Sequence, residues 1–137
     1  METEGLFAPE TASAARERYD ALGPSAQTVV KEVTRAMEFD AAEYDDRVSS
    51  AVVETARDAL FASMLEVRVG TREEFDEWRD STDCALTVEG SDNVDNVVWH
   101  VAPFADEVVA ATYNEKRRAA VDTLRRQAFG RIYREVV

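Results

Sequence analysis

The chain has 137 residues, the length of one domain, and its 28 acidic against 16 basic side chains give a formal net charge of −12. It contains no apolar run long enough to span a membrane, no signal-peptide pattern at its acidic amino terminus, and a single cysteine, which excludes an internal disulfide. We therefore expect a single globular domain over residues 1–137, located in the cytoplasm and without membrane contact.

The first 62 residues carry the pattern of three helices after a short terminus. Residues 1–10 are expected to be loosely ordered. Helices are predicted over residues 11–22, 24–37 and 40–61 from apolar residues at helical spacing, with Thr11 or Ser13 as the cap of the first.

The second and third helices each have a predicted inner face. On the second helix the side chains expected to point inward are Val29, Val33, Ala36 and Met37. The third is expected to open with a capping box of Asp40 and Glu43 and to bury a stripe of Tyr44, Val48, Val52, Thr55 and Ala59.

The hydrophobic period becomes strand-like after the third helix. Residues 65–69 alternate between apolar and charged, which predicts a strand with one solvent-exposed face. A capping box of Thr71 and Glu74 then opens a short helix over residues 72–80. The side chains that should hold this helix on the sheet are Phe75 and Trp78.

Two further strands are predicted over residues 84–89 and 96–102. The turn residues 90–93 between them favour an antiparallel hairpin. Because residues 96–102 are apolar on both faces, we place this strand at the centre of the sheet.

The last stretch, residues 105–137, is predicted to be one long helix because it contains no proline and carries an apolar stripe at helical spacing. That stripe consists of Val109, Tyr113, Ala120, Leu124, Ala128 and Ile132. The fold class is therefore predicted to be α+β and helix-rich, with three N-terminal helices, a small sheet of about three strands, and a long C-terminal helix packed across it.

The basic residues are 14 arginines and only two lysines. An acidic chain with almost no lysine is the pattern expected where molar salt is the solvent, because screening there shortens the reach of like-charge repulsion. In this respect the chain resembles the small, acidic, uncharacterised proteins of haloarchaea, a family defined as a domain of unknown function. The resemblance covers the composition and the helix–hairpin–helix order of the whole chain. It implies a habitat, and it transfers no activity, cofactor or catalytic residue.

The single histidine, His100, lies on the predicted central strand beside Trp99. A histidine suits general-base catalysis, but no second histidine and no carboxylate stand at a recognisable spacing, so a hydrogen-bonded structural role is favoured. A ligand pocket, where one forms, is expected between the sheet and the last helix. The residues predicted to line it are His100, Arg68, Tyr113 and Asn114.

Seven bases and five acids lie within residues 105–137, whereas nine bases and 23 acids precede them. An arginine-rich helix can bind nucleic acid or an acidic partner, but neutralisation by carboxylates of neighbouring helices is favoured here, so nucleic acid is not expected as a partner. The leading hypothesis is a binding protein that self-associates as a homodimer, or meets a protein partner, through the C-terminal helix. The residues predicted for that interaction surface are Val121, Arg125, Phe129 and Tyr133.

Two alternatives remain open at this point. One is a small-molecule-binding protein or enzyme that uses the pocket near His100, and the weaker one is a nucleic-acid-associated regulator. No cofactor, no metal ion and no catalytic residue is expected, because the chain lacks a glycine-rich phosphate loop, a nucleophile elbow, paired cysteines and the spacing of a calcium loop.

Overall fold

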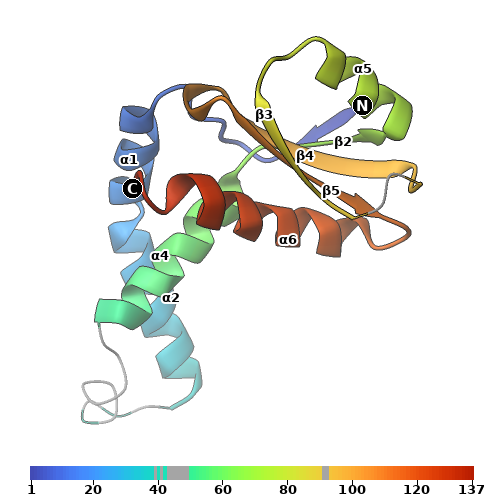
Figure 1. Ribbon diagram of the computed structural model, residues 1–137. Coiled ribbons are helices and arrows are strands. Elements are labelled where there is room, and N and C mark those ends of the chain that lie inside the picture. The colour runs from blue at the N-terminus through green and yellow to red at the C-terminus, as the bar shows by residue number, and fades with distance from the viewer. Residues whose placement is uncertain (39, 41, 43–49, 91–92) are drawn as a thin grey trace.

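The computed structural model describes residues 1–38, 40, 42, 50–90 and 93–137 (Figure 1). Its helices are α1 (Ala12–Ala21), α2 (Gly23–Ala36), α4 (Ser50–Met64), α5 (Arg72–Asp80) and α6 (Arg117–Ala128), with a 3₁₀ turn η1 (Pro103–Ala105) and a π-helical segment η2 (Phe129–Tyr133). Its strands are β1 (Glu2–Glu4), β2 (Val67–Thr71), β3 (Ala85–Glu89), β4 (Asn96–Ala102) and β5 (Glu107–Tyr113). The predicted α+β class is confirmed.

The described residues form one five-stranded sheet in the order β1-β2-β4-β5-β3. Strand β4 lies at its centre, as its two apolar faces predicted, and pairs antiparallel with β2 and β5. The predicted hairpin between β3 and β4 is wrong, because β3 pairs with β5 and runs parallel to it. A parallel pair needs a crossover, and the chain returns to β5 by way of β4 and η1.

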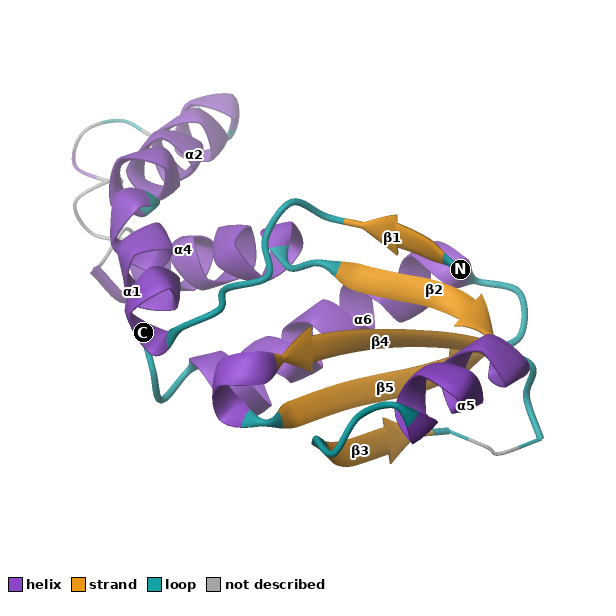
Figure 2. Ribbon diagram, turned by 90° about the horizontal axis from the view of Figure 1, so that it is seen from above, coloured by secondary structure: helices purple, strands orange, loops and turns teal. Residues whose placement is uncertain are grey.

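Helices cover the two faces of the sheet (Figure 2). The capping box of Thr71 and Glu74 is present at the start of α5, and Phe75 from this helix packs edge-on against Trp99 at 5.1 Å between ring centroids. The opposite face packs against α6, which contributes the fully buried side chains of Val121 and Leu124. The prediction that α5 is held on the sheet by its aromatic residues is confirmed.

Helices α1, α2 and α4 form an arm that extends away from the sheet beyond α6 (Figure 1). Thr11 caps α1 by accepting a hydrogen bond from the backbone N–H of Ala14 at 3.0 Å. Helix α4 joins the arm to the body through Phe61, which is fully buried. Four aromatic rings surround Phe61 with centroids 5.3–6.0 Å away, namely Phe7, Tyr19, Phe129 and Tyr133.

The amino terminus, expected to be loosely ordered, pairs with the sheet. Residues 2–4 form β1 and pair with β2, and Phe7 bridges to Leu65. Two arginines at the start of α6 hold β1 in place. Arg117 lies 2.6 Å from Glu2, and Arg118 lies 2.6 Å from Glu4. The carboxylates that made this segment look like a solvated terminus are therefore ion-pair partners of a distant helix.

The predicted long helix is wrong in its first part. Residues 107–113 form β5, which lies between β4 and β3, and α6 begins at Arg117. The segment reads Glu-Val-Val-Ala-Ala-Thr-Tyr, a short apolar run that suits a buried strand as well as a helix. Its β-branched residues favour the strand. The helical stripe is correct from α6 onward, where Leu124, Ala128 and Ile132 are buried.

The predicted inner face of α2 is also wrong. Its buried residues are Gly23, Ala26, Val30 and Thr34, whereas Val29, Val33 and Met37 are 42%, 53% and 59% exposed. Small residues on the buried side allow α2 to approach α4 closely. Glu43, the partner of Asp40 in the predicted capping box, lies outside the described residues, as do Tyr44 and Val48 near the start of that helix.

Candidate functional site

The residues of the predicted ligand pocket do not come together. His100 faces α6 from β4, while Arg68 on β2 lies over the ring of Trp78 on the α5 side. Tyr113 pairs with Asn96, four residues along β4 from His100 and so about 13 Å away. Asn114 lies at the same end, where its carbonyl accepts a hydrogen bond from Asn96. The prediction placed Tyr113 and Asn114 on a helix, and their position on and after β5 separates them from His100.

His100 is a fully enclosed residue with both ring nitrogens occupied. Its Nδ1 lies 2.6 Å from the carbonyl oxygen of Glu66, and its Nε2 lies 2.6 Å from the hydroxyl of Tyr133. A carbonyl can only accept, so Nδ1 carries the proton and Nε2 accepts from Tyr133. Burial lowers the pKa of His100 to about 4. This histidine is 1% exposed and joins the sheet to η2.

The residues predicted for the interaction surface are all enclosed by the chain itself. Val121, Phe129 and Tyr133 pack in the core between α6, α4 and the sheet, and Arg125 is 8% exposed. The side chains expected to face a partner thus face α4 and the sheet. Two of them, Arg125 and Phe129, line a cleft that the sequence did not reveal.

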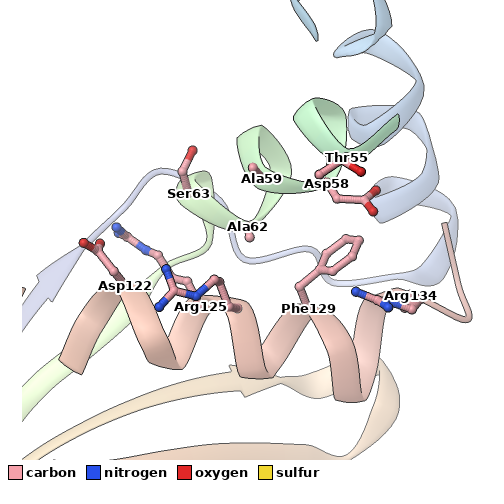
Figure 3. A pocket seen from close by; sticks show the side chains of 10 residues that line it. Thr55, Asp58, Ala59, Ala62, Ser63, Asp122, Arg125, Phe129 and Arg134 are labelled. Atoms are coloured by element: carbon pink, nitrogen blue, oxygen red, sulfur yellow. The ribbon is translucent and has the colours of Figure 1, made fainter. Parts of the chain in front are cut away.

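This cleft opens between α4 and α6 and has a volume of about 340 Å³ (Figure 3). Its apolar surface comes from Ala59 and Ala62 on α4 and from Phe129, which points from the other helix toward α4. Its remaining lining residues are polar or charged, namely Thr55, Asp58, Ser63, Asp122, Arg125, Arg126 and Arg134. The volume lies at the small end of the range for ligand pockets.

Arg125 is the most enclosed charge of the cleft. Its Nε donates to the carbonyl of Leu65 at 3.0 Å, which fixes the guanidinium at the junction of α4 and β2. Among the described residues no carboxylate lies within ion-pair distance of it. Burial and the neighbouring Arg118 lower the pKa of Arg125, but an arginine keeps its charge in proteins. Glu4 and Asp122 act on the guanidinium only from beyond ion-pair distance. An enclosed guanidinium without a carboxylate in contact is costly, and an anion in the cleft would reduce that cost.

The two other arginines of the cleft are also without a carboxylate within 4 Å in the described part of the chain. Arg126 donates to Thr123 at 3.4 Å, and Arg134 lies over the ring of Phe129, with its guanidinium carbon 5.6 Å from the centroid. Asp58, the acid at this end of the cleft, accepts a hydrogen bond from the hydroxyl of Tyr19 at 2.6 Å. Burial and Asp58 together raise the pKa of Tyr19 to about 12, so this bond persists across the physiological range.

The π-helical segment η2 sets the shape of this end of the cleft. Its widened turn is closed by a hydrogen bond from the N–H of Arg134 to the carbonyl of Phe129 at 2.9 Å. The wider turn lets Phe129, Ile132 and Tyr133 all be buried, with Phe129 at the cleft and Tyr133 against His100. Single π turns are frequent at functional sites.

Two signals in the sequence could have indicated the cleft. The neighbouring bases Arg125 and Arg126 lie on the helix that carries the apolar stripe, so one of them must approach the core. The face of α4 toward the cleft carries the small residues Thr55, Ala59 and Ser63, with Asp58 as the charged residue among them. The pairing of these two helices is a tertiary feature that no local pattern predicts.

The described residues contain no cluster of three or more histidine, cysteine, aspartate or glutamate side chains that could hold a metal ion. No helix within the same residues has both the length and the apolar character that crossing a bilayer requires.

The fold and the cleft together define a small α+β domain in which a helical arm and a sheet-covering helix enclose an arginine-lined cavity. The chain belongs to a family of unknown function, DUF5809, whose model matches residues 6–134. Neither a curated protein nor a solved structure matches the chain. The resemblance to a domain-of-unknown-function family is confirmed by this match.

Proposed function

We propose that the protein is a binding protein whose cleft between α4 and α6 takes a small organic anion with an apolar group. The observation that carries this proposal is Arg125, a guanidinium that is 8% exposed, lines the cleft, and has no carboxylate within ion-pair distance among the described residues. An anionic ligand in the cleft could form the ion pair with the Arg125 guanidinium that the described carboxylates do not form.

The lining of the cleft favours a carboxylate on an apolar frame over a bare inorganic anion. A carboxylate beside Arg125 would place the rest of the ligand over Ala59, Ala62 and Phe129. Phosphate would leave that apolar surface exposed to water and would gain no burial energy from it. The protein's formal charge of −12 also repels anions at long range, so affinity must come from contact inside the cleft.

Isothermal titration calorimetry with benzoate, acetate and inorganic phosphate tests the proposal. Benzoate should bind, whereas acetate and phosphate should bind at least about tenfold more weakly, because only benzoate covers the apolar lining. Arg125→Gln should weaken benzoate binding by about tenfold or more, since a charge-assisted bond contributes about 1.5–3 kcal/mol. Ala59→Leu should weaken it as well, by filling the cleft from the exposed face of α4 without changing charge.

The matched control is Arg79→Gln, which removes an exposed arginine from α5 on the opposite face of the sheet and should leave binding unchanged. The proposal is wrong when benzoate does not bind, or when it binds equally well to Arg125→Gln and Ala59→Leu. Equal affinity for phosphate and benzoate would overturn the assignment of an apolar ligand.

We also propose that the protein is adapted to the cytoplasm of a salt-accumulating cell, as its composition indicates. The support is 28 acidic residues with only two lysines. The free energy of unfolding should rise as KCl increases toward molar concentration, because salt screens the repulsion of the excess carboxylates. Chemical unfolding followed by circular dichroism measures this, and equal stability in dilute buffer and in molar KCl would contradict it.

A further inference from the structure

We infer that two copies of the chain associate edge to edge through β3, related by a two-fold axis at Thr87. This surface is separate from the cleft between α4 and α6, and the inference does not depend on the proposed ligand. Strand β3 is the last strand in the sheet order and pairs with β5 alone among the described strands.

The free edge of β3 presents a defined set of backbone groups. The N–H of Ala85 donates to the carbonyl of Asp106 at 2.8 Å, so Ala85, Thr87 and Glu89 direct their backbone groups toward β5. The N–H and C=O of one strand residue point to the same side, and those of the next residue point to the other side. Leu86 and Val88 therefore direct theirs away from β5. Two donors and two acceptors therefore line this edge, which is a template for another strand.

The two edges of the sheet are protected very differently. The opposite edge, β1, has three residues, two of which are glutamates in ion pairs with Arg117 and Arg118. Strand β3 has five residues and lacks the proline, lysine and covering ion pairs that usually prevent edge association. Its one charge is Glu89 at the end of the strand.

An antiparallel pair centred on Thr87 is self-complementary. Leu86 of one copy lies opposite Val88 of the second and exchanges two backbone hydrogen bonds with it, and the symmetric pair adds two more. On the α5 side, the apolar side chains of Leu86 and Val88 extend the cluster that contains Trp99 and Phe75. On the α6 side, Thr87 meets Thr87 of the second copy, a favourable cross-strand pair.

The charges of Glu89 on β3 and of Arg131 beside it fit the same register. Arg131 donates to the hydroxyl of Thr87 at 3.3 Å and lines a cavity of about 220 Å³ with Ala85 and Glu107. It has no carboxylate within 4 Å among the described residues. Glu89 of the second copy would lie opposite Ala85, on the face where Arg131 lies. Glu107, which pairs with Ala85, is the nearest carboxylate on that face, and Arg131 lines the same cavity. The two-fold axis thus places a Glu89 near each Arg131, and this charge complementarity selects a second copy of this chain as the partner.

Native mass measured by light scattering over a concentration series tests this inference. The wild-type mass should rise toward twice the 15.3 kDa of one chain. Glu89→Arg should remove the dimer by placing two arginines together, and the double variant Glu89→Arg/Arg131→Glu should restore it with the charges exchanged. Glu89 and Arg131 are both exposed, so neither change disturbs the core. All samples are compared at one KCl concentration because salt screens the pair.

A second measurement tests the register itself. In a Cys84→Ser background, Thr87→Cys should form an intermolecular disulfide on oxidation, because the residues at the axis of such a pair have Cα atoms about 4.5 Å apart. Ser63→Cys, an exposed position on α4, should not. A monomer at every concentration overturns the inference, as does a dimer that Glu89→Arg leaves intact or a Thr87→Cys protein that fails to cross-link.

Discussion

Replacement of Phe61 by alanine should lower the free energy of unfolding by about 4 kcal/mol, which is a large part of the total stability of a domain this size. Phe61 is fully buried where the helical arm meets the body, and its ring contacts rings from the amino-terminal segment, α1 and η2. Removing it leaves a cavity between three parts of the chain that no neighbouring side chain can fill without moving a helix. Urea unfolding followed by tryptophan fluorescence and circular dichroism measures the loss.

A matched control lies on the same helix. Val52 is 42% exposed, so Val52→Ala should change the free energy of unfolding by less than about 0.5 kcal/mol. Phe61→Leu should fall between the two, because leucine keeps most of the buried apolar volume. A loss below about 1 kcal/mol for Phe61→Ala would mean that the arm is not packed on the body through this ring.

Acid should destabilise the protein through His100 as the pH falls below 6.5. The pKa of His100 is lowered from 6.5 to about 4, so the folded state keeps the ring neutral while the unfolded chain takes up a proton below pH 6.5. Stability is therefore constant above the unfolded value and falls as the pH decreases from 6.5 to about 4, by about 3 kcal/mol in total. Protonation would also turn Nε2 into a donor, so the hydroxyl of Tyr133 would have to rotate, accept from Nε2 and give up the hydrogen bond that it donates.

The carboxylates with lowered pKa act in a separate range. Glu4 and Glu74 have pKa values below 4.5, so the stability they contribute is present above pH 4.5 and is lost only below it. Urea unfolding between neutral pH and pH 4.5 thus isolates the histidine. His100→Gln should be less stable at neutral pH but nearly independent of pH in this range, and an equal slope in both proteins would refute the assignment.

Local chemistry was enough to predict much of this fold. The capping box of Thr71 and Glu74 marked the start of α5, and the two apolar faces of residues 96–102 identified the central strand. These features depend on residues adjacent in sequence, so the sequence alone carries them. The structural role of His100 followed from the absence of any partner for catalysis, although its partner Tyr133 could not be foreseen from a separation of 33 residues.

The errors all come from interactions between distant segments. Residues 107–113 have an apolar pattern that fits a helix or a strand. They form a strand because they pair with β4, a contact that the local sequence does not show. Residues 2–4 look solvated until Arg117 and Arg118 are placed beside them. The cleft was missed for the same reason, since α4 and α6 are separated by more than fifty residues and a sheet.

The strand order has a consequence for how the chain acquires its structure during synthesis. Strands β4 and β5 hold the sheet together, and both are made in the last third of the described chain. When β1 and β2 leave the ribosome they can pair only with each other, and the helix whose arginines fix β1 follows more than a hundred residues after it. Such a high share of non-local contacts slows folding. The helical arm, with its local α2–α4 contacts, can form while translation continues, whereas the sheet must wait until Tyr113 has emerged.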